Sequence, residues 1–155
     1  MRELHPKRYK ERDTILFDNP LGWAANPGRP TMAELDDPAI CAGTAKFQIR
    51  STVLKQLIQE EHADARDRQN DSPTITQFID FMDQWKRREF PPLRAIGYCV
   101  SPRRHDYRVT VVGLLLEGET LTKSMKAMFR RFNRKATELD VGDIHNPRRL
   151  RSWWD

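Results

Sequence analysis

Length, composition and charge indicate a small globular protein and exclude several classes. The chain has 155 residues, enough for one domain, with 38% apolar and 32% charged residues. No apolar run is long enough for a membrane span, no apolar N-terminal segment indicates a signal peptide, and Cys41 and Cys99 are too few for a disulfide framework or a clustered metal site. We therefore expect a cytoplasmic protein with reduced thiols, without a cofactor and without a membrane partner.

The charge is distributed unevenly along the chain. Residues 1–85 contain 11 basic and 14 acidic residues, whereas residues 86–155 contain 16 basic and 8 acidic residues and carry a net charge of +8. An asymmetry of this size indicates an anionic partner, although it says nothing about the fold.

The two ends of the chain differ in composition from its middle. Residues 1–13 are basic and almost without apolar side chains, which predicts a mobile arm. Residues 14–43 contain many prolines and glycines together with large apolar residues, which predicts an ordered loop across the core. We expect a single domain over residues 14–142 and a basic, tryptophan-ended tail over residues 143–155.

The first half of the predicted domain contains one strand and two helices. Alternating apolar and polar residues predict a strand over residues 44–51, and an apolar stripe predicts a short helix over residues 53–66. A serine–proline pair predicts the start of a second helix, over residues 72–88, and a proline pair shortly after it predicts its end.

The second half contains two strands and a final helix. Residues 93–100 and 107–116 are typical of strands, and the short connection between them predicts an antiparallel hairpin. A long apolar stripe predicts the final helix over residues 120–140, with Gly142 placed to end it.

The predicted order is therefore strand, helix, helix, strand, strand, helix. This order predicts an α+β fold in which a three-stranded, partly antiparallel sheet packs against three helices. The same order occurs in KH domains, which bind single-stranded nucleic acid, but their Gly-x-x-Gly loop is absent between the first two helices. Element order alone assigns no function.

The predicted final helix has a basic face that contains no acidic residue. Its cations follow helical spacing or lie beside that row: Lys123, Lys126, Arg130, Arg131, Arg134 and Lys135. Like charges at this spacing repel one another by a few tenths of a kcal/mol per pair, which is about the size of a favourable ion pair. The row is either a solvated helix face or a surface that contacts phosphates.

Further arginines and two tryptophans complete the candidate binding surface. They lie in the predicted hairpin turn and in the predicted tail: Arg103, Arg104, Arg148, Arg149, Arg151, Trp153 and Trp154. Planar cations beside aromatic rings are typical both of nucleic-acid stacking surfaces and of protein interfaces. The alternative for the two tryptophans is that they pack on the sheet.

Indications of catalysis are few. His105-Asp106 and Asp143-x-His145 place a carboxylate near an imidazole, but no phosphate loop, nucleophile motif or paired metal ligands accompany them. The leading hypothesis is a non-enzymatic protein that binds nucleic acid or a ribonucleoprotein. The alternatives are an adaptor or regulatory subunit that docks an acidic protein through protein–protein interaction, and an enzyme with a histidine–carboxylate site.

Overall fold

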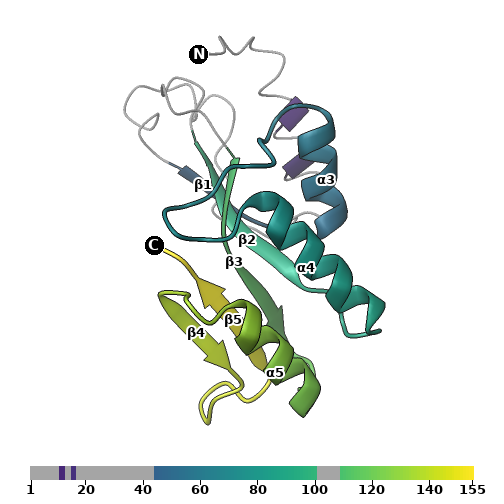
Figure 1. Ribbon diagram of the computed structural model, residues 1–155, viewed down its shortest axis with the longest axis vertical. Coiled ribbons are helices and arrows are strands. Elements are labelled where there is room, and N and C mark those ends of the chain that lie inside the picture. Colours follow the sequence, from purple (N-terminus) through teal and green to yellow (C-terminus); the bar gives the residue numbers. More distant parts are fainter. Residues whose placement is uncertain (1–10, 13–14, 17–43, 101–108) are drawn as a thin grey trace.

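Three helices cover one face of a five-stranded antiparallel sheet in the computed structural model, which describes residues 11–12, 15–16, 44–100 and 109–155 (Figure 1). The elements in chain order are β1 (Thr44–Ile49), α3 (Ser51–Gln59), α4 (Ile75–Arg87), β2 (Arg94–Val100), β3 (Val109–Glu117), α5 (Lys123–Phe132), β4 (Glu138–Val141) and β5 (Arg149–Trp153). The predicted α+β class is confirmed, but the sheet has five strands instead of three.

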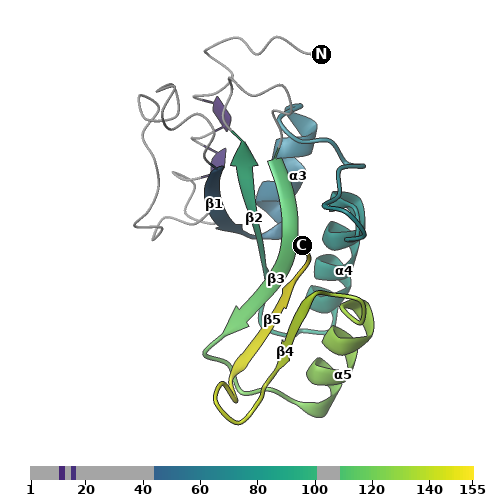
Figure 2. The same cartoon turned by 90° about the vertical axis from the view of Figure 1, so that its left-hand side faces the viewer.

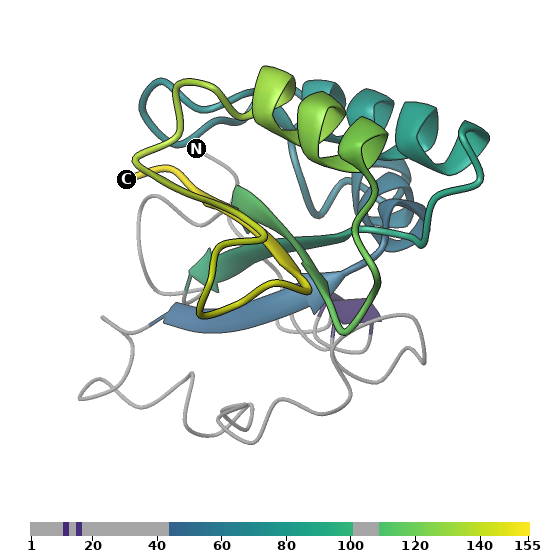
Figure 3. The ribbon, with the colours of Figure 1, turned by 90° about the horizontal axis from the view of Figure 1, so that it is seen from below.

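The sheet order is β1-β2-β3-β5-β4, with every neighbouring pair antiparallel. The predicted pairing of β2 with β3 is confirmed, and β1 joins the other edge of β2. Figure 2 shows the helices on one side of this sheet, and Figure 3 shows α4 and α5 as neighbours above it. The predicted hairpin turn, residues 101–106, lies outside the described residues.

The two strands that the sequence did not predict come from the segment after α5. Residues 138–141 form β4 and residues 149–153 form β5, which pairs with β3 through Leu115 and Arg151. The predicted final helix was therefore too long, because its last residues alternate along a strand that has β5 as partner. The segment predicted as a tail contributes β5 to the sheet.

Helix α4 begins later than the serine–proline pair suggested. Thr74 is its N-cap: the Thr74 hydroxyl accepts a hydrogen bond from the Gln77 amide at 3.2 Å, and the Gln77 side chain accepts one from the Thr74 amide at 2.8 Å. The Ser72 hydroxyl instead accepts a hydrogen bond from the Gln69 amide at 2.8 Å and donates one to the Pro73 carbonyl at 3.0 Å. These bonds fix the loop that leads into α4.

Aromatic rings hold α4, α5 and the C-terminus together. Phe81 and Phe132 stack with their centroids 4.1 Å apart, and Trp154 meets Phe78 edge to face at 5.6 Å. The Phe129 ring is fully buried. Since aromatic pairs of this kind contribute about 0.5–1.5 kcal/mol beyond the burial of their area, this cluster fixes the position of α5 on α4.

The described residues near the N-terminus also belong to the packed structure. Arg12, which falls in the predicted basic arm, is fully buried, and Ile15 and Leu16 lie in the core. The rest of the predicted arm and almost all of the predicted loop lie outside the described residues. Cys99 is a buried thiol of β2, whereas Cys41 is not described.

Gly113 sets how closely β5 can approach β3. A Cβ atom at Gly113 would lie 1.9 Å from the Ser152 carbonyl oxygen, which is a backbone atom and cannot move aside alone. We therefore expect Gly113→Ala to lower the free energy of unfolding by about 1–3 kcal/mol, measured by urea denaturation. The exposed Ala127 of α5 provides a control, since Ala127→Ser should change stability little. Unchanged stability in Gly113→Ala would contradict the close packing of β5 on β3.

Candidate functional site

Helix α5 ends at Phe132, so the predicted basic row is not one continuous helical row. Asn133 caps the helix: its backbone amide donates to the Phe129 carbonyl at 3.1 Å, and its side-chain amide donates to the same carbonyl at 2.8 Å. Arg134 and Lys135 therefore lie in the turn that follows α5. The conformation of this turn, and not the spacing of a helix, therefore sets the positions of their side chains.

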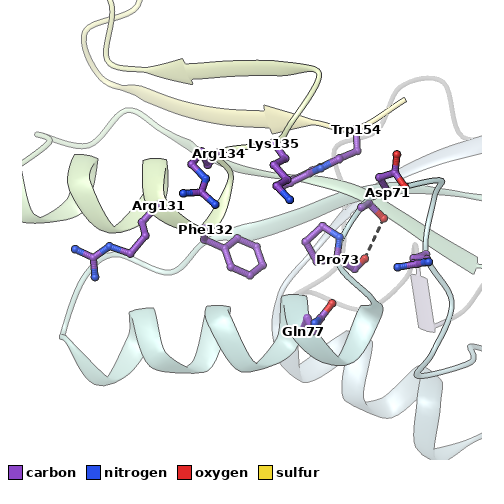
Figure 4. Close-up of a pocket in the computed structure, with 10 residues that line it drawn as sticks. Asp71, Pro73, Gln77, Arg131, Phe132, Arg134, Lys135 and Trp154 are labelled. Carbon is purple, nitrogen blue, oxygen red and sulfur yellow. Dashed lines mark hydrogen bonds between the residues drawn. The ribbon is translucent and has the colours of Figure 1, made fainter.

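The cations that remain on α5 lie on two flanks. Successive residues of a helix are about 100° apart around its axis, so Arg130 and Arg131 point in different directions. The Lys126 side chain lies near Gly142, directly after β4, and Lys123 and Arg130 occupy this same flank. Arg131 occupies the opposite flank, toward α4 (Figure 4).

A cleft of about 270 Å³ lies where the start of α4 meets the end of α5 (Figure 4). The α3–α4 loop with the first turn of α4, the end of α5 with its following turn, and the C-terminus all contribute to it. Its lining residues are Arg68, Asp71, Ser72, Pro73, Gln77, Arg131, Phe132, Arg134, Lys135 and Trp154. We call this the basic cleft, because four of these side chains are cations and one is a carboxylate.

The four cations of the basic cleft remain unpaired within the part of the chain that the structure describes. Their side chains are exposed, and within the described part of the chain none of them forms an ion pair: Arg68, Arg131, Arg134 and Lys135. Two unit charges 4 Å apart interact by about 1 kcal/mol in water and more strongly near a protein surface. An anionic ligand that enters the cleft would reduce the repulsion between these cations.

Trp154 forms part of the cleft wall and is not a freely exposed ring. It is 4% exposed, and its backbone amide donates to the Val112 carbonyl at 2.7 Å. Its indole Nε1 is buried without a hydrogen-bond acceptor among the described residues. A buried N–H group without an acceptor is uncommon in folded proteins. The alternative in which this ring packs on the sheet is thus the one observed.

Two predicted binding arginines of the tail form ion pairs with acidic residues of β4. Arg149 forms an ion pair with Asp140, and Arg151 pairs with Glu138 at 2.8 Å and lies over the Trp153 ring at 5.4 Å. Because side chains alternate along β5, these residues lie on the sheet face opposite Leu150 and the helices. Their acidic partners reduce the charge that they offer to a ligand.

The other arginines predicted to bind a partner do not line the basic cleft in the described part of the chain. Arg148 is exposed, and its guanidinium donates a hydrogen bond to the Gly118 carbonyl. Arg103 and Arg104 lie outside the described residues. The structure thus brings Arg131, Arg134 and Lys135 together, and adds Arg68, which the sequence did not single out.

The predicted catalytic pair Asp143-x-His145 lies in a turn that the Asp143 side chain stabilises. The Asp143 carboxylate accepts hydrogen bonds from the backbone amides of Asn146 at 2.8 Å and His145 at 3.0 Å. The pKa of Asp143 is lowered, chiefly because the Asn146 N–H stabilises the ionised carboxylate. The carboxylate is therefore hydrogen-bonded to backbone amides of its own turn. His105 and Asp106 are not described.

Three further observations bear on function. In residues 11–12, 15–16, 44–100 and 109–155, no group of three or more His, Cys, Asp and Glu side chains is arranged to hold a metal ion. No helix in these ranges has the length and apolar character needed to cross a bilayer. Comparisons of the chain with protein-family models, with curated proteins and with solved structures found no match. The basic cleft is thus the feature from which a function can be proposed.

Proposed function

We propose that this protein binds nucleic acid, free or within a ribonucleoprotein, through a surface centred on the basic cleft. One observation supports this function: four cations from two segments far apart in the sequence line a cleft that contains one carboxylate, and none of them forms an ion pair with a described residue. Phosphate groups are the natural counterpart of such a surface, since neutralising them releases condensed counterions and provides most of the non-specific affinity. The proposed role is binding, and it requires no catalytic step.

Cations outside the cleft extend the same positive surface. Lys126 and Arg130 lie within about 8 Å of Arg131 along the helix axis, because an α-helix rises 1.5 Å per residue. Their side chains lie on the other flank of α5, so they continue the positive charge around the helix, away from the cleft. Lys123 lies one turn further on. A nucleic-acid strand that passes from the cleft across α5 would therefore meet further positive groups.

Salt titration of nucleic-acid binding tests this function. With labelled duplex DNA, RNA and single-stranded probes, we expect the logarithm of affinity to fall linearly with the logarithm of salt concentration. If about five phosphates are neutralised, the slope is about −4.5 on duplex and about −3.5 on single strands. Fluorescence anisotropy between 50 and 200 mM salt measures it.

Poly(glutamic acid) of matched charge is the control for a general affinity for anions. Tighter binding of this polymer than of the nucleic acids would favour an acidic protein partner, as expected of an adaptor. Absence of binding to every nucleic-acid probe at 50 mM salt would refute the proposed function.

A further inference from the structure

We propose that the basic cleft binds a phosphomonoester, and that it receives the terminal phosphate of a nucleic-acid strand. The second part rests on the proposed nucleic-acid binding, whereas the first part concerns the cleft alone. The ligand of the cleft is a phosphate group with a single ester bond, whose three other oxygens are open to hydrogen bonding.

The shape of the cleft favours a terminal phosphate over a bridging one. Its volume of about 270 Å³ is just below the roughly 300–1,000 Å³ of typical small-molecule pockets, so it admits a small group and not a length of duplex. A bridging phosphate carries a nucleoside on both sides, so it fits a site of this size less readily than a group at the end of a strand. A terminal phosphate projects from the strand and can enter alone.

The charge of the cleft also matches a phosphomonoester. Such a group carries about −1.5 to −2 at neutral pH, compared with about −1 for a bridging phosphodiester. Arg131 lies in the last turn of α5, Arg134 in the turn that follows, and Arg68 in the α3–α4 loop, so cations line the cleft on two walls. Guanidinium groups bind two phosphate oxygens at once, which makes arginine better suited than lysine to orient the ligand.

The backbone on both walls is held in place before a ligand binds. Ser72 and Thr74 fix the loop at the start of α4 through their hydroxyl groups, and Asn133 fixes the end of α5. Ordering costs are therefore confined to the side chains. The Trp154 indole N–H, buried on the wall without an acceptor in the described part of the chain, is a donor that an entering oxygen would satisfy after a small shift of its neighbours.

Strands that differ only at their ends test the inference. One sequence is prepared with a 5′-phosphate, with a 3′-phosphate and with hydroxyl groups at both ends, and affinities are measured by anisotropy at constant salt. We expect one phosphorylated form to bind about ten-fold more tightly than the hydroxyl form, the effect of roughly one charge-assisted hydrogen bond. A nucleoside monophosphate and inorganic phosphate, added as competitors, should reduce this preference.

Two variants with the same change in net charge separate the cleft from the rest of the surface. Arg131→Gln with Arg134→Gln should abolish the preference for the phosphorylated end. Lys123→Gln with Arg130→Gln should weaken all strands equally and keep the preference. All four side chains are exposed, so both variants should keep the thermal midpoint of the wild type.

The possible outcomes decide between the two proposals. Equal, salt-sensitive affinity for all three strands overturns the phosphomonoester site and leaves the proposed function intact. Binding of a nucleoside monophosphate in the absence of strand binding supports the site and identifies a free nucleotide as its ligand, while the proposed function fails. Tighter binding of a phosphopeptide than of the phosphorylated strand overturns the assignment to nucleic acid. Loss of the preference in both variants to the same degree also overturns the site.

Discussion

Replacing Phe129 by alanine is expected to lower the free energy of unfolding by about 3–5 kcal/mol, a large part of the stability of a domain of this size. Phe129 is fully buried, and its ring meets that of Trp85 edge to face with the centroids 6.2 Å apart. The variant would leave a cavity between α5, α4 and the sheet that the surrounding rings cannot fill. Urea denaturation monitored by circular dichroism measures the loss.

Met128 provides the control for this prediction, because it precedes Phe129 on the same helix and is only partly buried. Met128→Ala should cost clearly less, since fewer contacts are lost and alanine favours the helix. A loss below about 1 kcal/mol in Phe129→Ala would contradict the observed register of α5. The register matters for function, because it places Arg131 on the flank toward the basic cleft.

Much of the fold could be predicted from residue patterns. Periodicity located β1, α4 and the antiparallel pair β2 and β3, because each has a strong apolar pattern and clear ends. Element boundaries were less accurate: α3 ends at Gln59 and not near Arg66, and α4 begins at Ile75 after a Thr74 cap. A side-chain cap decides the start of α4, whereas α3 ends where Glu61 adopts a φ of 62° and backbone amides bond the last carbonyls of the helix. Several residues in each loop were chemically able to end or begin a helix.

The hairpin of β4 and β5 could not be predicted from the helical pattern. Ala136 and Leu139 continue the apolar stripe of α5 by spacing alone, although the helix ends before Asn133. In β5, Leu150 and Ser152 alternate with arginines, which is a period-2 signal, but the density of charge made the segment resemble a tail. Pairing with β3 decides the conformation, and a pairing between distant segments leaves no local signal.

The composition of the candidate site likewise could not be predicted from local sequence patterns. Arg131, Arg149 and Arg151 are equivalent as residues in a basic sequence, yet Asp140 and Glu138 neutralise the last two. Arg68 comes from the loop between the first two predicted helices, which contains Asp67 and Asp71 and lacks the Gly-x-x-Gly motif. Only the packing of α4 against α5 brings this cation to the cleft. The sequence indicated a basic surface, whereas the fold determined which cations line the same cleft.

Reversing the charge of two cleft residues, Arg131→Glu with Arg134→Glu, is expected to lower nucleic-acid affinity at 0.1 M salt by at least about 60-fold. Each lost phosphate contact removes about 0.9 from the salt slope on duplex DNA, so the slope should become less steep by about 1.8. Repulsion between the new carboxylates and phosphate adds to the loss. Anisotropy titrations at several salt concentrations give both quantities.

The matched control reverses Lys86 and Arg87 at the end of α4, which changes the net charge by the same amount. Both pairs include cations in the last turn of a helix, where a carboxylate is unfavourable to the helix dipole, so their effects on stability should be similar. Lys86 lies about 13 Å along α4 from Gln77, and neither Lys86 nor Arg87 lines the basic cleft. The control should therefore keep most of the affinity and the full salt slope. Equal losses in the two variants would mean that only total charge attracts the nucleic acid and that the basic cleft has no special part in binding it.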